Sequence, residues 1–431
     1  MKFGTAVDLS VETKYNIKKD LNKMVTDMDF VKGGVCAAKG FKAAGVHCGI
    51  RKNKTKKDLA LIVSEKRAAS ACVYTRNLVK GAPIGVTKAH VADGYAQAII
   101  CNSGIANTCA SDGIETANGM CDIAAQALGI SEQDIVVAST GVIGPSLPLA
   151  PIRAHIGELV AGLSAEGSGD AATAIMTTDT VKKEVAVCFQ VDGVECRIGG
   201  IAKGSGMIHP NMATMLVFVT TDCDISQEML QKALSADVVD SFNMVSIDGD
   251  TSTNDMVTVL ANGMAENPKI TGEGPAYTAF CQALAAVTRS LCRMLAADGE
   301  GATKLLDCTV SGAPDAATAK TAAKSVICSS LVKTAMFGAD ANWGRVLCAL
   351  GYAGVELDPE KIDVSFKSAA GEVAVCKNGA GIPFDEDSAK RILSQNDIQI
   401  CIDLHSGVAS AQAWGCDMTY DYVKINGDYR T

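Results

Sequence analysis

The sequence lacks the features that mark several common classes of protein. Only five histidines occur in 431 residues, and no two cysteines stand in a Cys-x-x-Cys pattern. The ligand spacings that are typical of a zinc site are therefore missing. No apolar run approaches the ~18 residues that a membrane-spanning helix requires. Residues 1–24 are charged and polar, so we also expect no secretory signal.

Excess positive charge and phosphate-binding motifs are missing as well. The net charge of -9 disfavours nucleic acid or an anionic membrane as the main partner. Residues 299–304 end in Thr-Lys but lack the Walker spacing, and Gly204-Ser205-Gly206 has no third glycine at the required offset. We therefore expect neither a metal nor a nucleotide or other cofactor.

The chain is rich in cysteine and in apolar residues. It contains 17 cysteines, and apolar residues make up 48% of the sequence. Most cysteines stand in apolar runs such as Ile99-Ile100-Cys101, which predicts small buried side chains in a reducing, cytoplasmic environment. The length suffices for two or three domains around a large core.

Apolar patterning predicts a mixture of strands and helices. We expect strands at residues 58–64, 96–101, 135–138 and 305–310, and helices at 115–128, 227–234, 276–297, 316–330 and 386–394. Residues 184–190 and 194–201 flank Asp192-Gly193, a strong hairpin signal. Short strands and one helix after residue 362 predict a small α+β region. This order favours an α+β layered fold over a doubly wound parallel sheet.

Residues 203–222 form the most informative segment. A glycine-rich loop containing a proline leads into Ala213-Thr214, and the apolar run 215–219 follows at once. A threonine at such a junction is a candidate for self-cleavage, because its hydroxyl can attack the preceding carbonyl. The cut would free an amine on Thr214, which would then carry both nucleophile and base. Threonine is also common at the start of a buried strand, and for Thr214 alone this is the simpler interpretation.

The motifs along the chain resemble those of the ornithine acetyltransferase family, also called glutamate N-acetyltransferases or arginine biosynthesis bifunctional proteins. Residues 203–216, Lys-Gly-Ser-Gly-Met-Ile-His-Pro-Asn-Met-Ala-Thr-Met-Leu, are similar to the family signature. Further matches cover essentially the whole chain, at residues 40–45, 102–104, 139–144, 176–179, 298–304, 342–345 and 421–431. One departure is Ile105, where the family usually has an asparagine.

The resemblance implies a fold and a division of the chain. The expected fold is a layered α/β/β/α sandwich of the N-terminal-nucleophile-like, aminopeptidase-related type, with a smaller C-terminal α+β domain. Cleavage between Ala213 and Thr214 would give an alpha fragment, 1–213, and a beta fragment, 214–431. Within the beta fragment, 214–311 would complete the sandwich and about 312–431 would form the smaller region. The family also implies a heterotetramer of two alpha and two beta fragments.

The resemblance also implies a reaction and its residues. The family moves acetyl from N2-acetyl-L-ornithine to L-glutamate in the cyclic pathway of arginine biosynthesis, and some members also use acetyl-coenzyme A. The acetyl group would pass through an ester on Thr214, with its free amine as the base. Thr140 and Gly141 would form the oxyanion hole. The residues implied to contact substrate are Thr177, Lys203, Thr214, Glu300, Asn426 and Thr431.

Each of these residues also has a simpler structural interpretation. Thr140 could cap a turn, Lys203 could be a solvated lysine, Glu300 an exposed loop residue, and a chain end is usually frayed. His209 lies five residues before Thr214, but the family position tolerates other residues, so we favour the amine as base. Arg345 is expected to hold the fold or a subunit contact.

Three hypotheses stay open at this point. The first is the acetyltransferase, and the second is an amidase or aminopeptidase with the same N-terminal threonine. The third is a non-enzymatic protein for which cleavage is only maturation. Transfer differs from hydrolysis by whether water reaches the acyl-enzyme.

Overall fold

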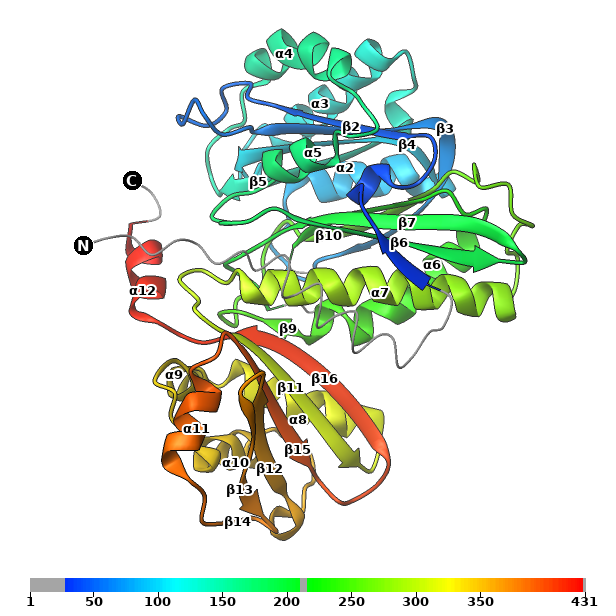
Figure 1. Cartoon of the computed structure of the whole chain (residues 1–431). Helices are drawn as coiled ribbons and strands as arrows, with labels where there is room; N and C mark the ends of the chain where they lie inside the picture. The colour runs from blue at the N-terminus through cyan, green and yellow to red at the C-terminus, as the bar shows by residue number, and fades with distance from the viewer. Residues whose placement is uncertain (1–27, 210–214, 429–431) are drawn as a thin grey trace.

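The computed structural model describes residues 28–209 and 215–428, which form two β-sheets with helices packed on them (Figure 1). The larger sheet has nine strands in the order β1-β6-β7-β8-β10-β3-β4-β5, with β2 paired to β3. Its strands are β1 (Met28–Val31), β2 (Phe41–Val46), β3 (Leu59–Tyr74), β4 (Tyr95–Ile105), β5 (Ile135–Val142), β6 (Lys183–Val191), β7 (Val194–Lys203), β8 (Leu216–Thr221) and β10 (Met256–Ala261).

The second sheet has seven strands in the order β14-β13-β12-β15-β11-β16-β9. These strands are β9 (Val245–Ser246), β11 (Leu305–Ala313), β12 (Asp363–Ser368), β13 (Gly371–Lys377), β14 (Ala380–Gly381), β15 (Asp397–Asp403) and β16 (Ala409–Cys416). Because β11 belongs to this sheet, the second sheet begins in the sequence before residue 312.

Helices connect the strands of both sheets. The α-helices are α2 (Ala82–His90), α3 (Gly113–Leu128), α4 (Leu149–Ala161), α5 (Ser168–Ala174), α6 (Gln227–Asp240), α7 (Pro275–Ala297), α8 (Ala316–Cys328), α9 (Ser330–Phe337), α10 (Trp343–Gly351), α11 (Glu386–Leu393) and α12 (Tyr420–Gly427). The short 3-10 helices are η1 (Gly34–Cys36), η2 (Val91–Asp93), η3 (Glu132–Asp134), η4 (Phe242–Met244) and η5 (Pro359–Lys361).

The long strand β3 folds the nine-stranded sheet into two layers. Its first half pairs with β2 and β4, its last six residues pair with β10, and the register with β4 shifts between Val63 and Ala68. Such an irregularity bends a strand and increases its twist. The β2–β5 part of the sheet therefore lies against the part formed by β6, β7, β8 and β10 (Figure 1).

Alternation along the strands places helices on the two outer faces. Leu59 and Leu61 pack with residues of α3 and α4, and the side chains of Val217 and Val219 join a core that includes α6 and α7. The intervening residues, such as Ile62 and Phe218, meet in a third core between the two layers. The predicted α/β/β/α arrangement is thereby confirmed.

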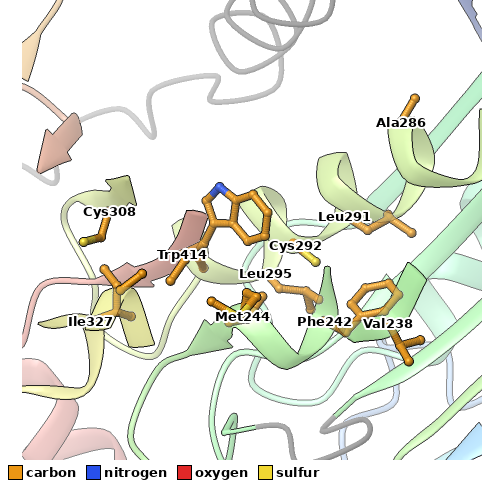
Figure 2. Packing of buried hydrophobic residues seen from close by; sticks show 14 of the residues in the cluster. Val238, Phe242, Met244, Ala286, Leu291, Cys292, Leu295, Cys308, Ile327 and Trp414 are labelled. Atoms are coloured by element: carbon orange, nitrogen blue, oxygen red, sulfur yellow. The ribbon is translucent and has the colours of Figure 1, made fainter. Parts of the chain in front are cut away.

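Helix α7 joins the sandwich to the second sheet. Buried residues of α7, including Cys292 and Leu295, share one hydrophobic core with Cys308, Ile327 and Trp414 from the second sheet and α8 (Figure 2). The Trp414 indole donates to Asp307 Oδ2 at 3.2 Å.

An ion cluster reinforces this junction. Arg293 of α7 pairs with Asp307 and, at 2.8 Å, with Asp397. A continuous core and a largely buried ion cluster therefore hold the second sheet against the sandwich.

The expected elements are found, with several differences in extent. Strands β4 and β5 continue to Ile105 and Val142, and the helix expected at 316–330 ends at Cys328, after which α9 begins at Ser330. The hairpin is present, with Val191 opposite Val194. The strand expected at 58–64 begins at Leu59 and continues to Tyr74, because the residues at 68–73 are largely buried after a short exposed stretch. The helix expected at 227–234 continues to Asp240, because Val238 remains buried.

Other sequence expectations concern membrane spans, metals and cysteines. Among the described helices, none combines the length and the apolar character needed to cross a bilayer. Nowhere in residues 28–209 and 215–428 do three His, Cys, Asp or Glu side chains gather as a metal site would require. The cysteines are free thiols, most of them buried or half-buried, while Cys109 and Cys348 are exposed.

Candidate active site

The predicted cleavage point adjoins the start of a central strand. Leu216, the first residue of β8, pairs with Lys203 at the end of β7 and with Met256 at the start of β10. The Met256 N–H donates to the Met215 carbonyl at 2.9 Å. Ala213 and Thr214 lie outside the described residues, and Met215 is the first described residue after them. Strands β7 and β10 therefore flank the chain directly after the predicted cut.

Thr140 and Gly141 occupy the end of β5, beside the end of β4. Thr140 is opposite Ser103, and Gly141 is opposite Gly104. Gly141 has φ 133°, and a Cβ there would lie 2.2 Å from the carbonyl carbon of Gly104. Only glycine fits this conformation and this close approach. At the position implied for the oxyanion hole, the backbones of the neighbouring strands β4 and β5 therefore approach each other closely.

Asn254 fastens these strand ends together. Its Nδ2 donates to the Ala106 carbonyl at 2.6 Å and to the Ser139 carbonyl at 3.0 Å. Its Oδ1 accepts from Thr108 Oγ1 at 2.6 Å. Sequence reasoning missed Asn254, because the polar run 251–255 before an apolar strand is typical of any turn. These amide contacts form only because the fold brings Asn254, just before β10, beside the ends of β4 and β5.

Thr177 is held near Lys203 by one carboxylate. Asp179 Oδ2 accepts from the Thr177 N–H at 2.9 Å, and Asp179 Oδ1 accepts from the Gly204 N–H at 2.7 Å. Lys183 Nζ bonds Asp179 Oδ1 at 2.7 Å and Asp298 Oδ2 at 2.6 Å. The backbone that follows Lys203 is thereby tied to the backbone of Thr177.

Asp179, Lys183 and Asp298 are all buried, and the pKa values of Asp179 and Lys183 show how their charges are stabilised. Burial disfavours the charge on Asp179, but the ammonium groups of Lys183 and Lys203 hold its pKa below the ordinary value. Burial likewise opposes the charge on Lys183, yet the carboxylates of Asp179 and Asp298 raise its pKa. Each group keeps its charge because it has partners of opposite sign. The sequence gives no direct signal for this cluster, because most lysines are exposed.

Lys203 is not the solvated lysine of the simpler interpretation, because only 9% of it is exposed. Burial lowers the pKa of its ammonium group, and the carboxylates of Asp179 and Asp255 oppose that shift. Among the described residues, no carboxylate oxygen lies within 4.0 Å of the ammonium nitrogen. The ammonium group of Lys203 therefore lies in the interior, at the end of β7.

Glu300 is buried as well, with 8% exposed, and it meets the C-terminal helix. Its N–H donates to the Ser205 carbonyl at 2.8 Å, and its Oε2 accepts from Asn426 Nδ2 at 2.8 Å. A Cβ on Gly206 would lie 2.4 Å from the Glu300 carboxylate, so this glycine makes room for the acid. Two of the residues implied to bind substrate thus touch each other, from segments 126 positions apart.

The loop that leads toward the predicted cleavage point is held by Asp248. Its carboxylate accepts from the N–H groups of Met207 at 2.6 Å and Ile208 at 2.9 Å. His209 follows, with Nδ1 3.1 Å from Ser246 Oγ and 3.5 Å from Cys328 Sγ. Burial, with the nearby Lys324 ammonium, lowers the pKa of His209 to about 4. The imidazole is therefore neutral near pH 7 and engaged in structural contacts.

Arg51 and Ser103 connect the Thr140 region to the Thr177 region. Ser103 Oγ donates to the Ala174 carbonyl at 2.6 Å, and the Arg51 guanidinium donates to the Met176 carbonyl. A chain of contacts therefore runs from the ends of β4 and β5 to Thr177 and on to Gly204. Thr140, Thr177, Lys203, Glu300 and Asn426 belong to one connected region, while Thr431 lies outside the described residues.

Two further residues singled out in the sequence have structural contacts. Ile105, the departure from the family pattern, accepts a bond from Asn102 Nδ2 at 2.9 Å through its backbone carbonyl. That bond does not depend on the side chain at position 105. Arg345 Nη1 donates to the Leu331 carbonyl at 2.8 Å, which ties α10 to α9 and gives Arg345 a role in holding the fold.

The fold and the site define a class, and the sequence comparisons name the family. The chain is a layered α/β/β/α protein with buried charged and hydroxyl groups gathered where its central strands end. The family model described as the ArgJ family matches residues 42–431. The chain belongs to the ArgJ family.

Relatives with curated names match nearly the whole chain. The arginine biosynthesis bifunctional protein ArgJ of Symbiobacterium thermophilum is 50% identical over 406 residues, which cover 94% of this chain and 100% of that protein. The protein of the same name from Caldanaerobacter subterraneus is 49% identical over 405 residues, with 94% and 100% covered.

Solved structures give partial matches. The crystal structure of arginine biosynthesis bifunctional protein argJ from Bacillus halodurans is 45% identical. It covers 49% of this chain and 97% of that chain, with a TM-score of 0.47. Ornithine acetyltransferase complexed with ornithine, from Mycobacterium tuberculosis, is 36% identical. The match covers 43% of this chain and 100% of that chain, with a TM-score of 0.40. Both TM-scores are below 0.5, so membership of the family rests on the sequence matches.

Proposed function

We propose that this protein transfers an acetyl group from N-acetylornithine to glutamate, in the biosynthesis of arginine. Whole-length relatives that carry the name arginine biosynthesis bifunctional protein support this assignment. The observation that carries it is the meeting of Glu300 with Asn426, in the same region as Lys203. A buried carboxylate suits the ornithine ammonium, and a buried ammonium suits a substrate carboxylate.

The chemistry would proceed through a covalent intermediate. The Thr214 hydroxyl attacks the acetyl carbonyl of N-acetylornithine, the C–N bond breaks, and the Thr214 amine returns the proton to leaving ornithine. Glutamate then attacks the acetyl ester by the reverse route. Thr140 and the Gly141 N–H stabilise the oxyanion in each step. Both donor and product are amides of α-amines, so the exchange needs neither ATP nor a bound cofactor.

The proposal includes maturation and assembly. Self-cleavage between Ala213 and Thr214 would free the amine and give fragments 1–213 and 214–431. The second fragment would contain β8 and β10 of the sandwich and the described strands of the second sheet. Two copies of each fragment would form a heterotetramer in the cytoplasm. Acetyl-coenzyme A is a second candidate donor to glutamate.

A two-donor assay tests this function. Purified protein is supplied with glutamate and either N-acetylornithine or acetyl-coenzyme A, and N-acetylglutamate is quantified. Acetyl transfer from N-acetylornithine, with an acetyl mass on the fragment that starts at Thr214, is the expected result. The matched control is Thr214→Ala, which should show neither cleavage nor transfer.

The competing hypothesis is an amidase or aminopeptidase with the same nucleophile. It predicts release of acetate from N-acetylornithine at a rate that glutamate does not change. Protein that is active yet uncleaved by intact mass would rule out the N-terminal nucleophile for both hypotheses.

A further inference from the structure

The side chain of Asn254 uses its full hydrogen-bonding capacity on segments that are distant in the sequence. Its Nδ2 donates to the carbonyls of Ala106, at 2.6 Å, and Ser139, at 3.0 Å. Its Oδ1 accepts from Thr108 Oγ1 at 2.6 Å and from Thr253 Oγ1 at 2.5 Å. An asparagine amide has two donor hydrogens and two acceptor lone pairs, so all four are occupied. Because only 7% of the residue is exposed, the amide is a buried and fully satisfied link.

One end of this link adjoins the residues implied for the oxyanion hole. Ser139 directly precedes Thr140 in β5. Ala106 directly follows β4, and its N–H donates to the carbonyl of Val142, the last residue of β5, at 2.9 Å. The amide of Asn254 therefore holds β5 one residue before Thr140 and holds the chain that leaves β4 beside it.

The other end of the link is the backbone that pairs with the chain after the predicted cut. Two residues after Asn254, the Met256 N–H donates to the Met215 carbonyl at 2.9 Å. Met215 directly follows Thr214 in the sequence. Asn254 thus connects the neighbour of Thr140, through its side chain, with the neighbour of Thr214, through the backbone that continues into β10.

We propose that Asn254 is a positioning residue for acetyl transfer, which acts by holding Thr140 and Gly141 where the oxyanion forms. This inference rests on the proposed function. An oxyanion donor is effective only when it already stands at the position that the charged oxygen will occupy. A misplacement of about 1 Å can lower a reaction rate by roughly 10². A rigid link one residue from Thr140 is therefore sufficient to control the rate.

Cleavage would increase the importance of this link. Thr140 would belong to fragment 1–213, and Thr214 and Asn254 would belong to fragment 214–431. After the cut, no peptide bond would connect the oxyanion donors with the nucleophile, so noncovalent contacts alone would keep them aligned. Asn254 donates both of its amide hydrogens across this division, to the carbonyls of Ala106 and Ser139.

A double-mutant cycle tests whether Asn254 acts through Thr140. Asn254→Asp keeps the shape of the side chain but replaces the donor of two hydrogen bonds with an acceptor. In cleaved, folded protein it should lower kcat by roughly 10² and leave the KM for N-acetylornithine near its wild-type value. In the Thr140→Ala background the same change should lower kcat by at most about tenfold, because only the Gly141 N–H remains to be misplaced. Equal losses in the two backgrounds would overturn the proposal, since the effects of independent structural changes multiply.

Gly81→Ala displaces the same amide without changing its chemistry. A Cβ on Gly81 would lie 2.5 Å from Asn254 Nδ2 and 2.9 Å from Thr108 Oγ1. Gly81 has φ -61°, which any residue adopts, so the alanine adds no backbone strain. The variant should lower kcat, whereas the matched control Gly85→Ala in α2, where a Cβ would meet nothing within 4 Å, should keep the wild-type rate. Equal kcat values in the two folded variants would contradict the role of Asn254.

Hydrogen exchange keeps the test decisive if Asn254→Asp fails to fold or to cleave, because it requires neither substrate nor transfer. Backbone amides of residues 139–142 should exchange faster in Gly81→Ala than in the wild type and in Gly85→Ala. Unchanged exchange in Gly81→Ala would show that the Asn254 amide does not hold the end of β5, and would overturn the inference alone. A wild-type protein that transfers no acetyl from N-acetylornithine would instead refute the proposed function, and the inference with it.

Discussion

Asn426 Nδ2 donates a hydrogen bond to Glu300 Oε2 at 2.8 Å and so joins the C-terminal helix to a buried acid. A second bond, from Thr419 Oγ1 to the Gly301 carbonyl at 2.7 Å, holds the start of the same helix to the same loop. Helix α12 itself has no buried residue. Its attachment to the body therefore depends on these polar contacts and on the edge-to-face packing of Tyr420 against Phe337.

This contact predicts the effect of changes at Asn426. Asn426→Ala should raise the KM for N-acetylornithine, because Glu300 loses the partner that orients its carboxylate. Asn426→Asp should raise it further, since two carboxylates would then face each other. The matched control is Lys424→Ala on the exposed surface of the same helix. An unchanged KM in Asn426→Asp would show that helix α12 does not contribute to substrate binding.

A comparison of Gly141 with Gly144 distinguishes a steric requirement for glycine from the cost of backbone strain alone. Both have positive φ, 133° and 108°, but a Cβ on Gly144 would meet nothing within 4 Å. Gly144→Ala should cost only the strain of such a conformation, about 1–3 kcal/mol of unfolding free energy. Gly141→Ala should cost more and should also reduce kcat, because the ends of β4 and β5 must separate. Urea unfolding and steady-state rates measure both effects, and equal losses would contradict the argument.

Thr140→Ala tests the oxyanion hole. The variant should fold and cleave, because the β5 backbone is held by Asn254 through the Ser139 carbonyl. The value of kcat should fall by roughly 10²–10³ if the hydroxyl is a true oxyanion donor. A folded variant with a wild-type rate would show that Thr140 has only a structural role at the end of β5.

Lys183→Met should destabilise the protein strongly, whereas Lys182→Met should not. Removing Lys183 leaves Asp179 and Asp298 buried without their cation, at a cost of roughly 3–5 kcal/mol in unfolding free energy. Lys182 pairs with Glu184 at the surface, where such pairs contribute about 0–1 kcal/mol. Urea unfolding of the two variants makes the comparison, and a similar small loss in both would show that the cluster contributes little.

The pH dependence of stability should reverse in the Lys183 variant. In the wild type the pKa of Asp179 is lowered, so its contribution to stability is complete above its ordinary pKa of ~3.9 and is lost below it. Without Lys183, burial should raise that pKa instead. Stability should then decrease as the pH rises through the raised value. An unchanged slope against pH would contradict the assigned ion pair.

His209 should not be the base of the reaction. Its pKa of about 4 leaves it neutral across the working range, while a free α-amine has an ordinary pKa of roughly 7.7–8.0. His209→Gln should therefore keep the decrease in reaction rate at low pH that protonation of the Thr214 amine causes, with at most a modest change in the rate itself. If this decrease at low pH disappeared in a cleaved, folded variant, the proton transfer would be assigned to His209.

Much of the fold follows from local sequence. Short apolar runs located the strands, and the Asp192-Gly193 pair located a hairpin that closes with Val191 opposite Val194. Such signals are readable because they depend on neighbours within a few residues. The ends of β3 and α6 were less well predicted, because burial by distant elements extends both of them.

The sequence by itself also determined the set of candidate site residues. The loop before Thr214 and the family motifs pointed to Thr140, Thr177, Lys203, Glu300 and Asn426. Only the tertiary structure decided that Lys203 and Glu300 are buried, that Asn426 reaches Glu300, and that Asp179, Lys183 and Asp255 surround the same strand ends. The physical reason is that burial and charge pairing are set by groups far apart in the chain. Lys183 and Asp298 are 115 positions apart in the sequence, yet they form an ion pair in the interior.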